Sequence, residues 1–182
     1  MRAATGRRSY RWALVPIGMV GVASLAIALS ATGAGNKPKC FGKEATKVGN
    51  GNPNTINGTP QNDVIVSLGG GDSVDGKAGN DRICTDGGAD GAAGGAGDDK
   101  INGGPKADSL DGDTGIDNQP GDGEDLIKGT RGADRLEGQG ADDKILGGDN
   151  NDILDGQSGK ADFCDGGPRG DNVTNCETGP GD

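Results

Sequence analysis

The sequence of 182 residues contains no histidine, and only 2% of its residues are aromatic. The absence of histidine removes the usual general acid–base group and the commonest ligand of transition metals. With 30% hydrophobic residues in total, a conventional two-layer core is hard to build. Glycine is abundant instead, with 39 residues. Much glycine together with much acid is typical of disorder, so a folded structure needs a specific pattern in its favour.

The N-terminal segment, residues 1–34, has a different composition from the rest. Its basic head contains Arg2, Arg7, Arg8 and Arg11, an uncharged apolar run covers residues 13–29, and small residues follow. This order predicts a secretory signal peptide that is cleaved from the mature protein. An uncleaved membrane anchor is the alternative, because no charge occurs between Trp12 and Lys37.

Cleavage would make the chain more acidic. It removes four of the 18 bases and none of the 28 acids, which leaves a formal net charge of −14. A chain with this charge repels nucleic acid and attracts cations. We therefore expect metal ions as partners and no nucleic acid.

Four cysteines, an even number, indicate disulfides in an exported chain: Cys40, Cys84, Cys164 and Cys176. The sequence alone permits three pairings. Pairing Cys164 with Cys176 closes a short C-terminal loop and leaves Cys40 with Cys84. The alternative, a zinc site, requires closely spaced pairs of ligands, and the sequence lacks them.

A nine-residue repeat runs from Gly49 to Thr174 and gives fourteen units, of which GGAGDDKIN (residues 94–102) is representative. Residues 121–128 form a unit one residue short, and residues 156–165 form a unit one residue long. The first position is glycine except at Ser67 and Thr85. The sixth position is an acid or its amide in every unit: Asn54, Asp63, Asp72, Asp81, Asp90, Asp99, Asp108, Asp117, Asp125, Asp134, Asp143, Asp152, Asp162 and Asp171.

The eighth position of the unit is apolar, with Gln119 as the clear exception. Its other members are Ile56, Ile65, Val74, Ile83, Ala92, Ile101, Leu110, Ile127, Leu136, Ile145, Leu154, Cys164 and Val173. A flexible linker has no reason to keep an apolar residue two places after an acid through fourteen units. The repeat therefore excludes disorder for this part of the chain.

The repeat predicts an all-β fold of stacked, short parallel strands. The first six residues of each unit favour a turn that uses left-handed backbone conformations, and the last three favour a short strand with one apolar side chain inward. Two units then complete one circuit of the chain around the fold, which we call a lap, and stacked laps form two parallel sheets across a thin aliphatic core. In this arrangement Asp99 stacks with Asp81 and Asp117, two units away on either side. Stacked acids repel, so we expect a cation between the turns.

The units resemble the haemolysin-type calcium-binding repeat of the repeats-in-toxin family, whose nonapeptide reads G-G-x-G-x-D-x-(aliphatic)-x. The resemblance implies a parallel β-roll with several Ca2+ ions in its turns, held by carboxylates and main-chain carbonyls. Carried over to this chain, the implied ligands are Asp63, Asp72, Asp81, Asp90, Asp99, Asp108, Asp117, Asp125, Asp134, Asp143, Asp152, Asp162 and Asp171.

The expected organisation is a cap at residues 35–48, the calcium-binding repeats at 49–174 and a tail at 175–182. Lys106 and Arg169 replace the fourth-position glycine, so calcium should bind less well at those turns. Gln119 and Pro120 cannot continue a strand ladder, and together with the short unit they predict a degenerate break near residues 112–128.

No pattern in the sequence favours catalysis. Asp98 and Asp99 are adjacent, but the fifth position varies between units, as expected for a solvated turn residue. The segment 111–122 lacks the glycine and glutamate of an EF-hand loop. We therefore expect a secreted, non-enzymatic calcium-binding repeat protein that folds on binding the ion. Two alternatives stay open: a cell-surface or matrix adhesion module with an unidentified partner, and a non-catalytic remnant of a secreted hydrolase or toxin.

Overall fold

A computed structural model of the protein describes residues 36–113 and 121–178. The predicted signal peptide or anchor and the acid Asp117 lie outside these residues. Within the described ranges no helix is long and apolar enough to span a membrane.

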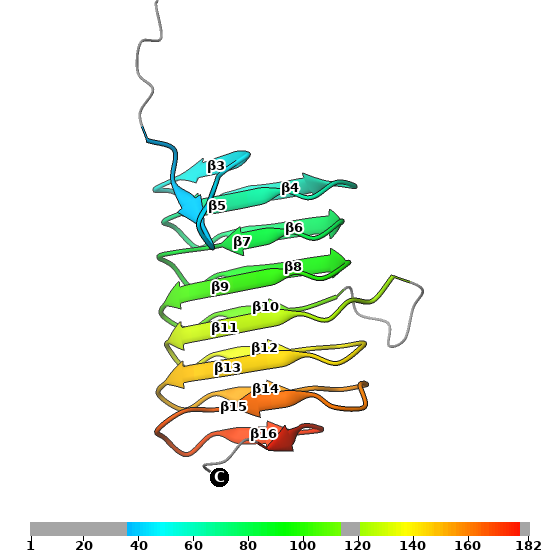
Figure 1. Ribbon diagram of the computed structural model, residues 1–182. Helices are drawn as coiled ribbons and strands as arrows, with labels where there is room; N and C mark the ends of the chain where they lie inside the picture. The colour runs from blue at the N-terminus through cyan, green and yellow to red at the C-terminus, as the bar shows by residue number, and fades with distance from the viewer. Residues whose placement is uncertain (1–35, 114–120, 179–182) are drawn as a thin grey trace, which may run out of the picture. The chain divides into compact units, whose positions relative to one another are not determined.

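The described chain forms two parallel sheets whose strands alternate along the sequence (Figure 1). The even-numbered sheet contains β4 (Thr55–Thr59), β6 (Ser73–Ala78), β8 (Gly91–Ala96), β10 (Ser109–Asp111), β12 (Arg135–Glu137), β14 (Ile153–Asp155) and β16 (Asn172–Thr174). The odd-numbered sheet contains β3 (Lys47–Asn50), β5 (Val64–Leu68), β7 (Arg82–Cys84), β9 (Lys100–Pro105), β11 (Leu126–Arg131), β13 (Lys144–Asp149), β15 (Phe163–Asp165) and β17 (Glu177–Thr178).

The pairing register places equal repeat positions side by side. Ile83 of β7 pairs with Ile101 of β9, which in turn pairs with Ile127 of β11. Because neighbouring strands of one sheet are two units apart, each lap consists of two units. The predicted parallel β-roll is confirmed.

The core is the column of eighth-position side chains, as the sequence predicts. Eleven of them form one buried cluster, from Ile65 to Cys164, against which Ile56, Val173 and Cys176 pack. Each unit contributes one apolar residue, so the core is only one side chain thick per half-lap. Stability must therefore come from many small and similar contributions.

Several strands are longer than the three residues expected from the repeat. β6, β8, β9, β11 and β13 have six residues, because the first three positions of the next unit also pair with the neighbouring laps. The turns use left-handed backbone conformations at the second and fourth positions. Examples are Lys77 with φ 89° and Gly97 with φ 116°. These two positions explain why the motif asks for glycine there.

Strands β10 and β11 are successive half-laps of the roll, although the sequence predicts two units, residues 112–120 and 121–128, after β10. Strand β11, which begins at Leu126 within the second of these units, pairs directly with β9, and Asp125 lies next to Asp99. The expected stacking of Asp99 with Asp117 is therefore wrong, because the register advances by 26 residues here. Among the described residues of 112–128, Ile127 alone belongs to the buried core cluster, which matches a single core layer between Leu110 and Leu136.

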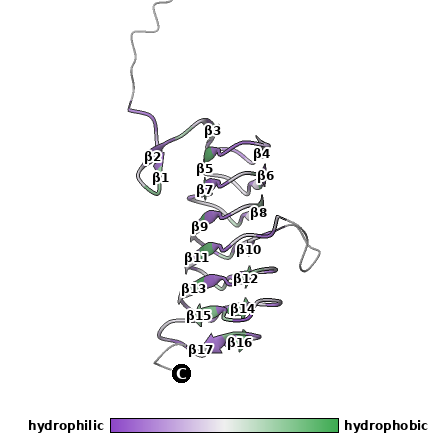
Figure 2. Cartoon of the chain, turned by 45° about the vertical axis from the view of Figure 1, so that its right-hand side comes forward, coloured by the Kyte–Doolittle hydropathy of each residue, from purple (hydrophilic) through white to green (hydrophobic). Residues whose placement is uncertain are grey.

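A short hairpin precedes the roll and covers part of its outer surface. β1 (Lys39–Cys40) pairs with β2 (Lys43–Glu44), and the hairpin stands beside the odd-numbered column of strands in Figure 2. Cys40 and Ala45 pack with Val64, Val66 and Cys84 in a second buried cluster. The hairpin thus shields two outward-facing valines from water.

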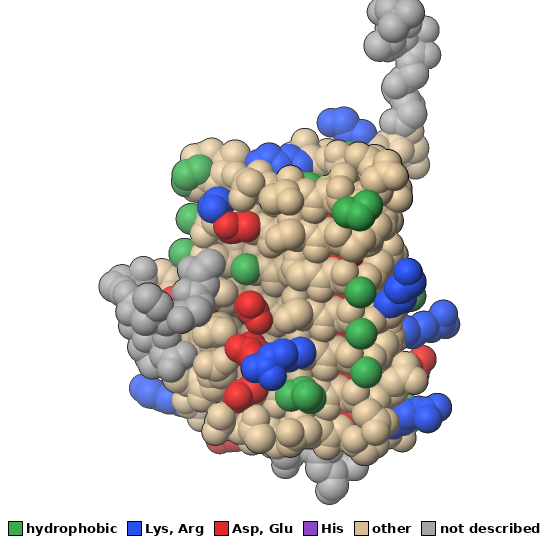
Figure 3. All heavy atoms as spheres, turned by 180° about the vertical axis from the view of Figure 1, so that it is seen from behind, with side chains coloured by type: hydrophobic (Ala, Val, Ile, Leu, Met, Phe, Trp, Pro, Cys, Tyr) green, Lys and Arg blue, Asp and Glu red, His purple; other side chains and the backbone are tan. Residues whose placement is uncertain are grey.

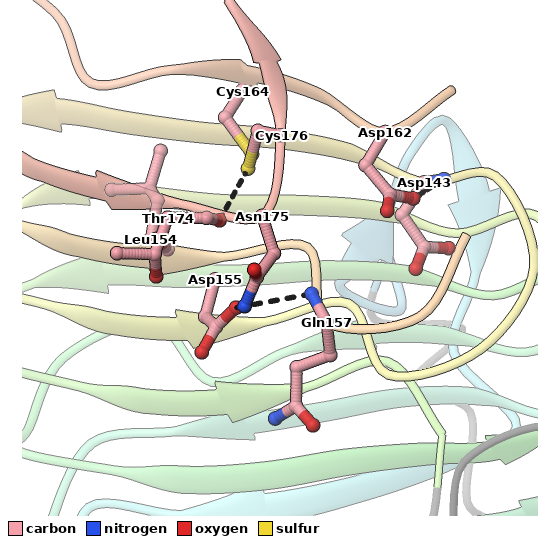
Figure 4. Close-up of a disulfide and its surroundings, with 9 residues drawn as sticks. All are labelled: Asp143, Leu154, Asp155, Gln157, Asp162, Cys164, Thr174, Asn175 and Cys176. Atoms are coloured by element: carbon pink, nitrogen blue, oxygen red, sulfur yellow. Dashed lines mark hydrogen bonds between the residues drawn. A yellow bond between two sulfur atoms is a disulfide. The ribbon is translucent and has the colours of Figure 1, made fainter. Parts of the chain in front are cut away.

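Both disulfide pairings considered above are present. Cys40 is bonded to Cys84, which joins the hairpin to β7, and Cys164 is bonded to Cys176 near the C-terminus. Figure 4 shows the second bond beside the last laps of the roll. No free cysteine occurs in the described residues.

Candidate metal centres in the turns

The sixth-position aspartates form two columns, because alternate units lie on opposite sides of the roll. Each aspartate directly precedes a strand, and all but Asp171 are at most 7% exposed. The A column precedes the odd-numbered strands and contains Asp63, Asp81, Asp99, Asp125, Asp143 and Asp162. The B column precedes the even-numbered strands and contains Asp72, Asp90, Asp108, Asp134, Asp152 and Asp171.

One carboxylate oxygen of each aspartate ties successive laps together. The backbone N–H of Asp81 donates to Oδ1 of Asp99 at 2.7 Å, and that of Asp99 donates to Oδ1 of Asp125 at 2.8 Å. The same bond joins Asp143 to Asp162 at 2.9 Å, and these two side chains lie close together in Figure 4. The aspartates therefore have a structural role that the sequence pattern does not reveal.

The other oxygen, Oδ2, is buried without a hydrogen-bond partner in nine of these side chains: Asp72, Asp81, Asp90, Asp99, Asp108, Asp125, Asp134, Asp143 and Asp152. An unpartnered buried polar atom is costly, and a buried charge is costlier still. A cation or a proton is needed to compensate the cost of burying these nine oxygens.

The first-position glycine provides the space beside Oδ2. A Cβ atom on Gly94 would collide with Oδ2 of Asp99 and with the carbonyl oxygen of Gly112 in the next lap. The Gly112 carbonyl accepts a hydrogen bond from the Gly95 N–H at 2.9 Å, and a carbonyl oxygen has two lone pairs. Carboxylate and carbonyl oxygens thus face the same position.

Burial raises the pKa values of many of these carboxyl groups, and repulsion between neighbouring acids adds to the effect. The pKa of Asp99 is raised to about 8, that of Asp125 to about 9 and that of Asp143 to about 7. In the B column the pKa of Asp108 is raised to about 7 and that of Asp134 to about 6. The uncompensated charge is thus least tolerated in the middle of the A column.

Asp63, at the N-terminal end of the A column, has partners for both oxygens. Thr46 Oγ1 donates to Oδ1 at 3.1 Å, while the Lys47 ammonium and the Thr59 N–H donate to Oδ2 at 3.2 and 2.7 Å. Burial alone would raise its pKa, but the bonds from Thr59, Lys47 and Thr46 lower it. A lysine therefore provides here the positive charge that the inner turns lack.

Hydroxyl groups partly fill the corresponding space in the first laps of the B column. Ser67 and Thr85 occupy first positions, and their hydroxyls donate to the carbonyls of Thr85 and Gly103 at 2.9 and 2.7 Å. Their side chains occupy space that the glycines of the A column leave open. The A column therefore has the more open positions.

The donor set determines which ion these turns could hold. In the described residues no three acidic or cysteine side chains converge on one point. The aspartates instead come one per lap, so a bound ion would need main-chain carbonyls as further ligands. Oxygen ligands in an irregular arrangement suit Ca2+, whereas Mg2+ demands regular octahedra and zinc favours nitrogen or sulfur.

Comparison with known protein families agrees with this chemistry. The RTX calcium-binding nonapeptide repeat (4 copies) matches residues 48–83, 85–118 and 120–160, which is more than half of the chain. The protein belongs to this RTX family. Its repeats bind several Ca2+ ions. No curated protein and no solved structure matches the chain.

The structure places twelve of the thirteen sequence-predicted RTX ligands in the two columns, and Asp117 lies outside the described residues. Sequence reasoning missed three features of these columns: the ammonium group of Lys47, the hydroxyls of Ser67 and Thr85, and the buried carboxylate of Asp113, the residue after Gly112. Lys47 precedes the repeat, and no sequence signal marks it. Asp113 occupies a second position where the motif has glycine, and that departure was a visible signal.

Proposed function

We propose that this RTX protein is exported and that its roll folds when Ca2+ occupies the unpartnered carboxylate positions of the two columns. The observation that carries the proposal is the set of nine buried Oδ2 atoms without a hydrogen-bond partner. Seven of them lie beside the first-position glycine of their own half-lap. The proposed ligands are the sixth-position aspartates, with Asp63 the weakest candidate because Lys47 already neutralises it.

Coupling between binding and folding follows from the thin core. Each half-lap buries one apolar side chain, which is little for nine ordered residues rich in glycine. Without a cation the carboxylates of a column repel one another across the stacked laps. Calcium would remove this repulsion, so its binding energy contributes directly to folding.

Export is supported by two features. The N-terminal segment has the pattern of a signal peptide, and the chain forms two disulfides, which persist mainly in oxidising compartments. Calcium is scarce inside cells and near millimolar outside, so a roll with weak sites would fold after export. Expression with the N-terminal segment intact, followed by assay of culture medium and washed cells, tests this proposal.

The described surface offers no feature that favours adhesion over simple calcium binding. The exposed large hydrophobic residues of the described chain are Val48, Leu68 and Ile153, which belong to β3, β5 and β14. Figure 3 shows the back of the molecule, where apolar side chains are scattered among acidic and basic ones. Retention of the protein on washed cells would nevertheless support the adhesion alternative. The RTX roll is a structural calcium-binding fold, and we propose no catalytic activity for it.

Circular dichroism of the purified protein with EDTA and with increasing calcium tests the central proposal. We expect little β signal in EDTA and a cooperative gain as calcium reaches about millimolar concentration. Magnesium at equal concentration and ionic strength is the control, and it should restore much less signal. A full β signal in EDTA at neutral pH would contradict coupled folding.

A further inference from the structure

The first laps of the roll differ from the later ones in how the charges of their turns are compensated. These laps are residues 36–84, from the hairpin to the end of β7 at the upper end of the roll in Figure 1, and we call them the capped laps. In the later laps, the seven described sixth-position acids from Asp90 to Asp152 all have a buried Oδ2 without a hydrogen-bond partner. The capped laps contain four sixth-position residues: Asn54, Asp63, Asp72 and Asp81.

Lys47 supplies a cation to the first turn of the A column. It is paired in the strand register with Ile65, a residue of the buried core, and therefore stands at an inward position of β3. Its ammonium lies 3.2 Å from Oδ2 of Asp63, and the two side chains are 27% and 9% exposed. Thr59 donates to the same oxygen from its N–H and its hydroxyl, at 2.7 and 2.8 Å. The atom that is unpartnered in the later laps thus has three donors here.

Two further turns of the capped laps also depend less on a cation. Asn54 has a neutral amide at the sixth position, so it brings no charge into the B column. Ser67 is fully buried, and its hydroxyl donates to a carbonyl of the next lap at 2.9 Å, a bond that the usual glycine cannot form. Asp72 and Asp81 keep an unpartnered Oδ2. Two of the four sixth positions in the capped laps therefore have this oxygen, whereas in residues 90–152 every described one has it.

The capped laps also have more contacts that do not involve the columns. Ile65, Val74 and Ile83 belong to the main core, and the second buried cluster lies entirely within these laps. The disulfide between Cys40 and Cys84 closes a loop over almost the whole of residues 36–84. Apolar burial and a disulfide stabilise a fold whether or not calcium is present. The capped laps should therefore be the most stable part of the roll when calcium is low.

We propose that the Lys47 ammonium is a built-in replacement for a calcium ion, and that it makes the capped laps the part of the roll that folds at the lowest calcium concentration. The inference rests on the calcium-coupled folding proposed above and adds a direction to it. Each repeat of a solenoid contacts only its neighbours, so a folded end provides the surface on which the next lap can pair. Folding would then spread from β7 toward the C-terminus as calcium fills successive turns.

Hydrogen exchange of the full, oxidised chain tests the inference when it is followed by mass spectrometry at neutral pH over a range of calcium concentrations. In the wild type, peptides from β5 and β7 should become protected at a calcium concentration at least about tenfold lower than peptides from β13 and β15. In Lys47→Met the half-buried carboxylate of Asp63 loses its counter-charge, so this difference should shrink severalfold or vanish.

The matched control is Lys77→Met, which removes the other lysine–aspartate ion pair of the capped laps. Lys77 contacts Asp75 at 2.5 Å, but both side chains are more exposed, at 48% and 37%, and neither belongs to a column. This variant loses the same charge from the same laps and should keep the wild-type difference. An equal loss in Lys77→Met would overturn the inference.

A double variant separates the charge of Lys47 from the packing of its side chain. Asp63→Asn in the Lys47→Met background gives a neutral sixth position, as Asn54 already does in the preceding half-lap, so early protection of β5 and β7 should return. A double variant that behaves like Lys47→Met would overturn the role of Lys47 as a counter-charge. This comparison decides the question even if Lys47→Met alone does not regain its β signal in saturating calcium.

The wild type alone gives two further outcomes that differ from each other. Equal calcium midpoints along the whole described chain would overturn the inference and leave calcium-coupled folding intact, and so would an unchanged difference in Lys47→Met. Exchange that does not respond to calcium in any described strand would contradict the proposed function itself, and the inference would fail with it.

Discussion

At the scale of single residues, each column aspartate serves two purposes that oppose each other when no calcium is present. Oδ1 of Asp99 accepts the Asp81 N–H and holds two laps together, while its Oδ2 is buried without a partner. The first contact stabilises the roll in all conditions. The second is favourable only when a cation or a proton is present, because burial raises the pKa of Asp99 to about 8.

The substitution Asp99→Asn separates these two contributions. The amide oxygen can still accept the Asp81 N–H, but the charge is lost. We expect the variant to be more stable than the wild type in EDTA by about 1 kcal/mol or more, and less stable in saturating calcium by a similar amount. Thermal unfolding in both conditions measures the change of sign. Asp98→Asn, on the exposed neighbour, should shift neither value much, and a loss of stability in both conditions for Asp99→Asn would contradict this account.

The acids of the columns could be predicted from the sequence because the repeat fixes their spacing. Their neighbours could not. Lys47 lies before the first unit, and only the folded chain shows that its ammonium reaches Asp63 at 3.2 Å. The nine-residue spacing selects Asp117 as the neighbour of Asp99, whereas the structure shows Asp125 in that place. Side chains that depart from the phase are positioned by three-dimensional packing, which a sequence pattern does not describe.

At the scale of elements, the roll is closed at its two ends by different devices. The hairpin β1–β2 covers Val64 and Val66 and is bonded to β7 through Cys40 and Cys84. At the other end, Cys164 of β15 is bonded to Cys176, across a separation of only 12 residues. The first bond closes a much longer loop, since its cysteines are 44 residues apart.

Loop length predicts which disulfide matters more for folding. On the chain-entropy model, the longer loop stabilises the protein by about 4 kcal/mol and the shorter by about 3 kcal/mol. Removal of the first bond also loosens the hairpin from the two valines. We therefore expect the double variant Cys40→Ser/Cys84→Ser to need more calcium for folding than Cys164→Ser/Cys176→Ser. Calcium titrations followed by circular dichroism measure both midpoints, and the reverse order would contradict the prediction.

The strands show how far a repeat pattern determines elements. The inward apolar residue and the parallel pairing followed directly from the eighth position, and both are confirmed. The six-residue length of β9 or β13 did not follow, because positions one to three read as a turn rich in glycine. They become strand through hydrogen bonds with the neighbouring laps, and those laps exist only in the assembled roll.

At the scale of the whole molecule, the two columns accumulate charge along the roll. Most column aspartates have raised pKa values, and burial is the principal cause in each case. Asp63 has a lowered pKa and acts in the opposite direction. The balance lies with the raised values, so protons and calcium ions are alternative means of neutralising the same buried oxygens.

Acid should therefore replace calcium. A carboxyl group whose pKa is higher in the folded state stabilises the fold fully below its unfolded value of 3.8, and this contribution is lost as the pH rises through the folded value. The raised pKa values run from about 6 for Asp81 to about 9 for Asp125, so the loss should extend from about pH 4 to pH 9. Between its unfolded and its folded pKa value, each such group lowers the free energy of unfolding by about 1.4 kcal/mol for every unit by which the pH rises.

In EDTA we expect a β signal near pH 4 that disappears toward pH 8, and calcium should restore it at pH 8. Circular dichroism across this range measures the effect, with light scattering to exclude aggregation. A signal in EDTA that is absent at pH 4 and present at pH 8 would contradict the role of these carboxyl groups.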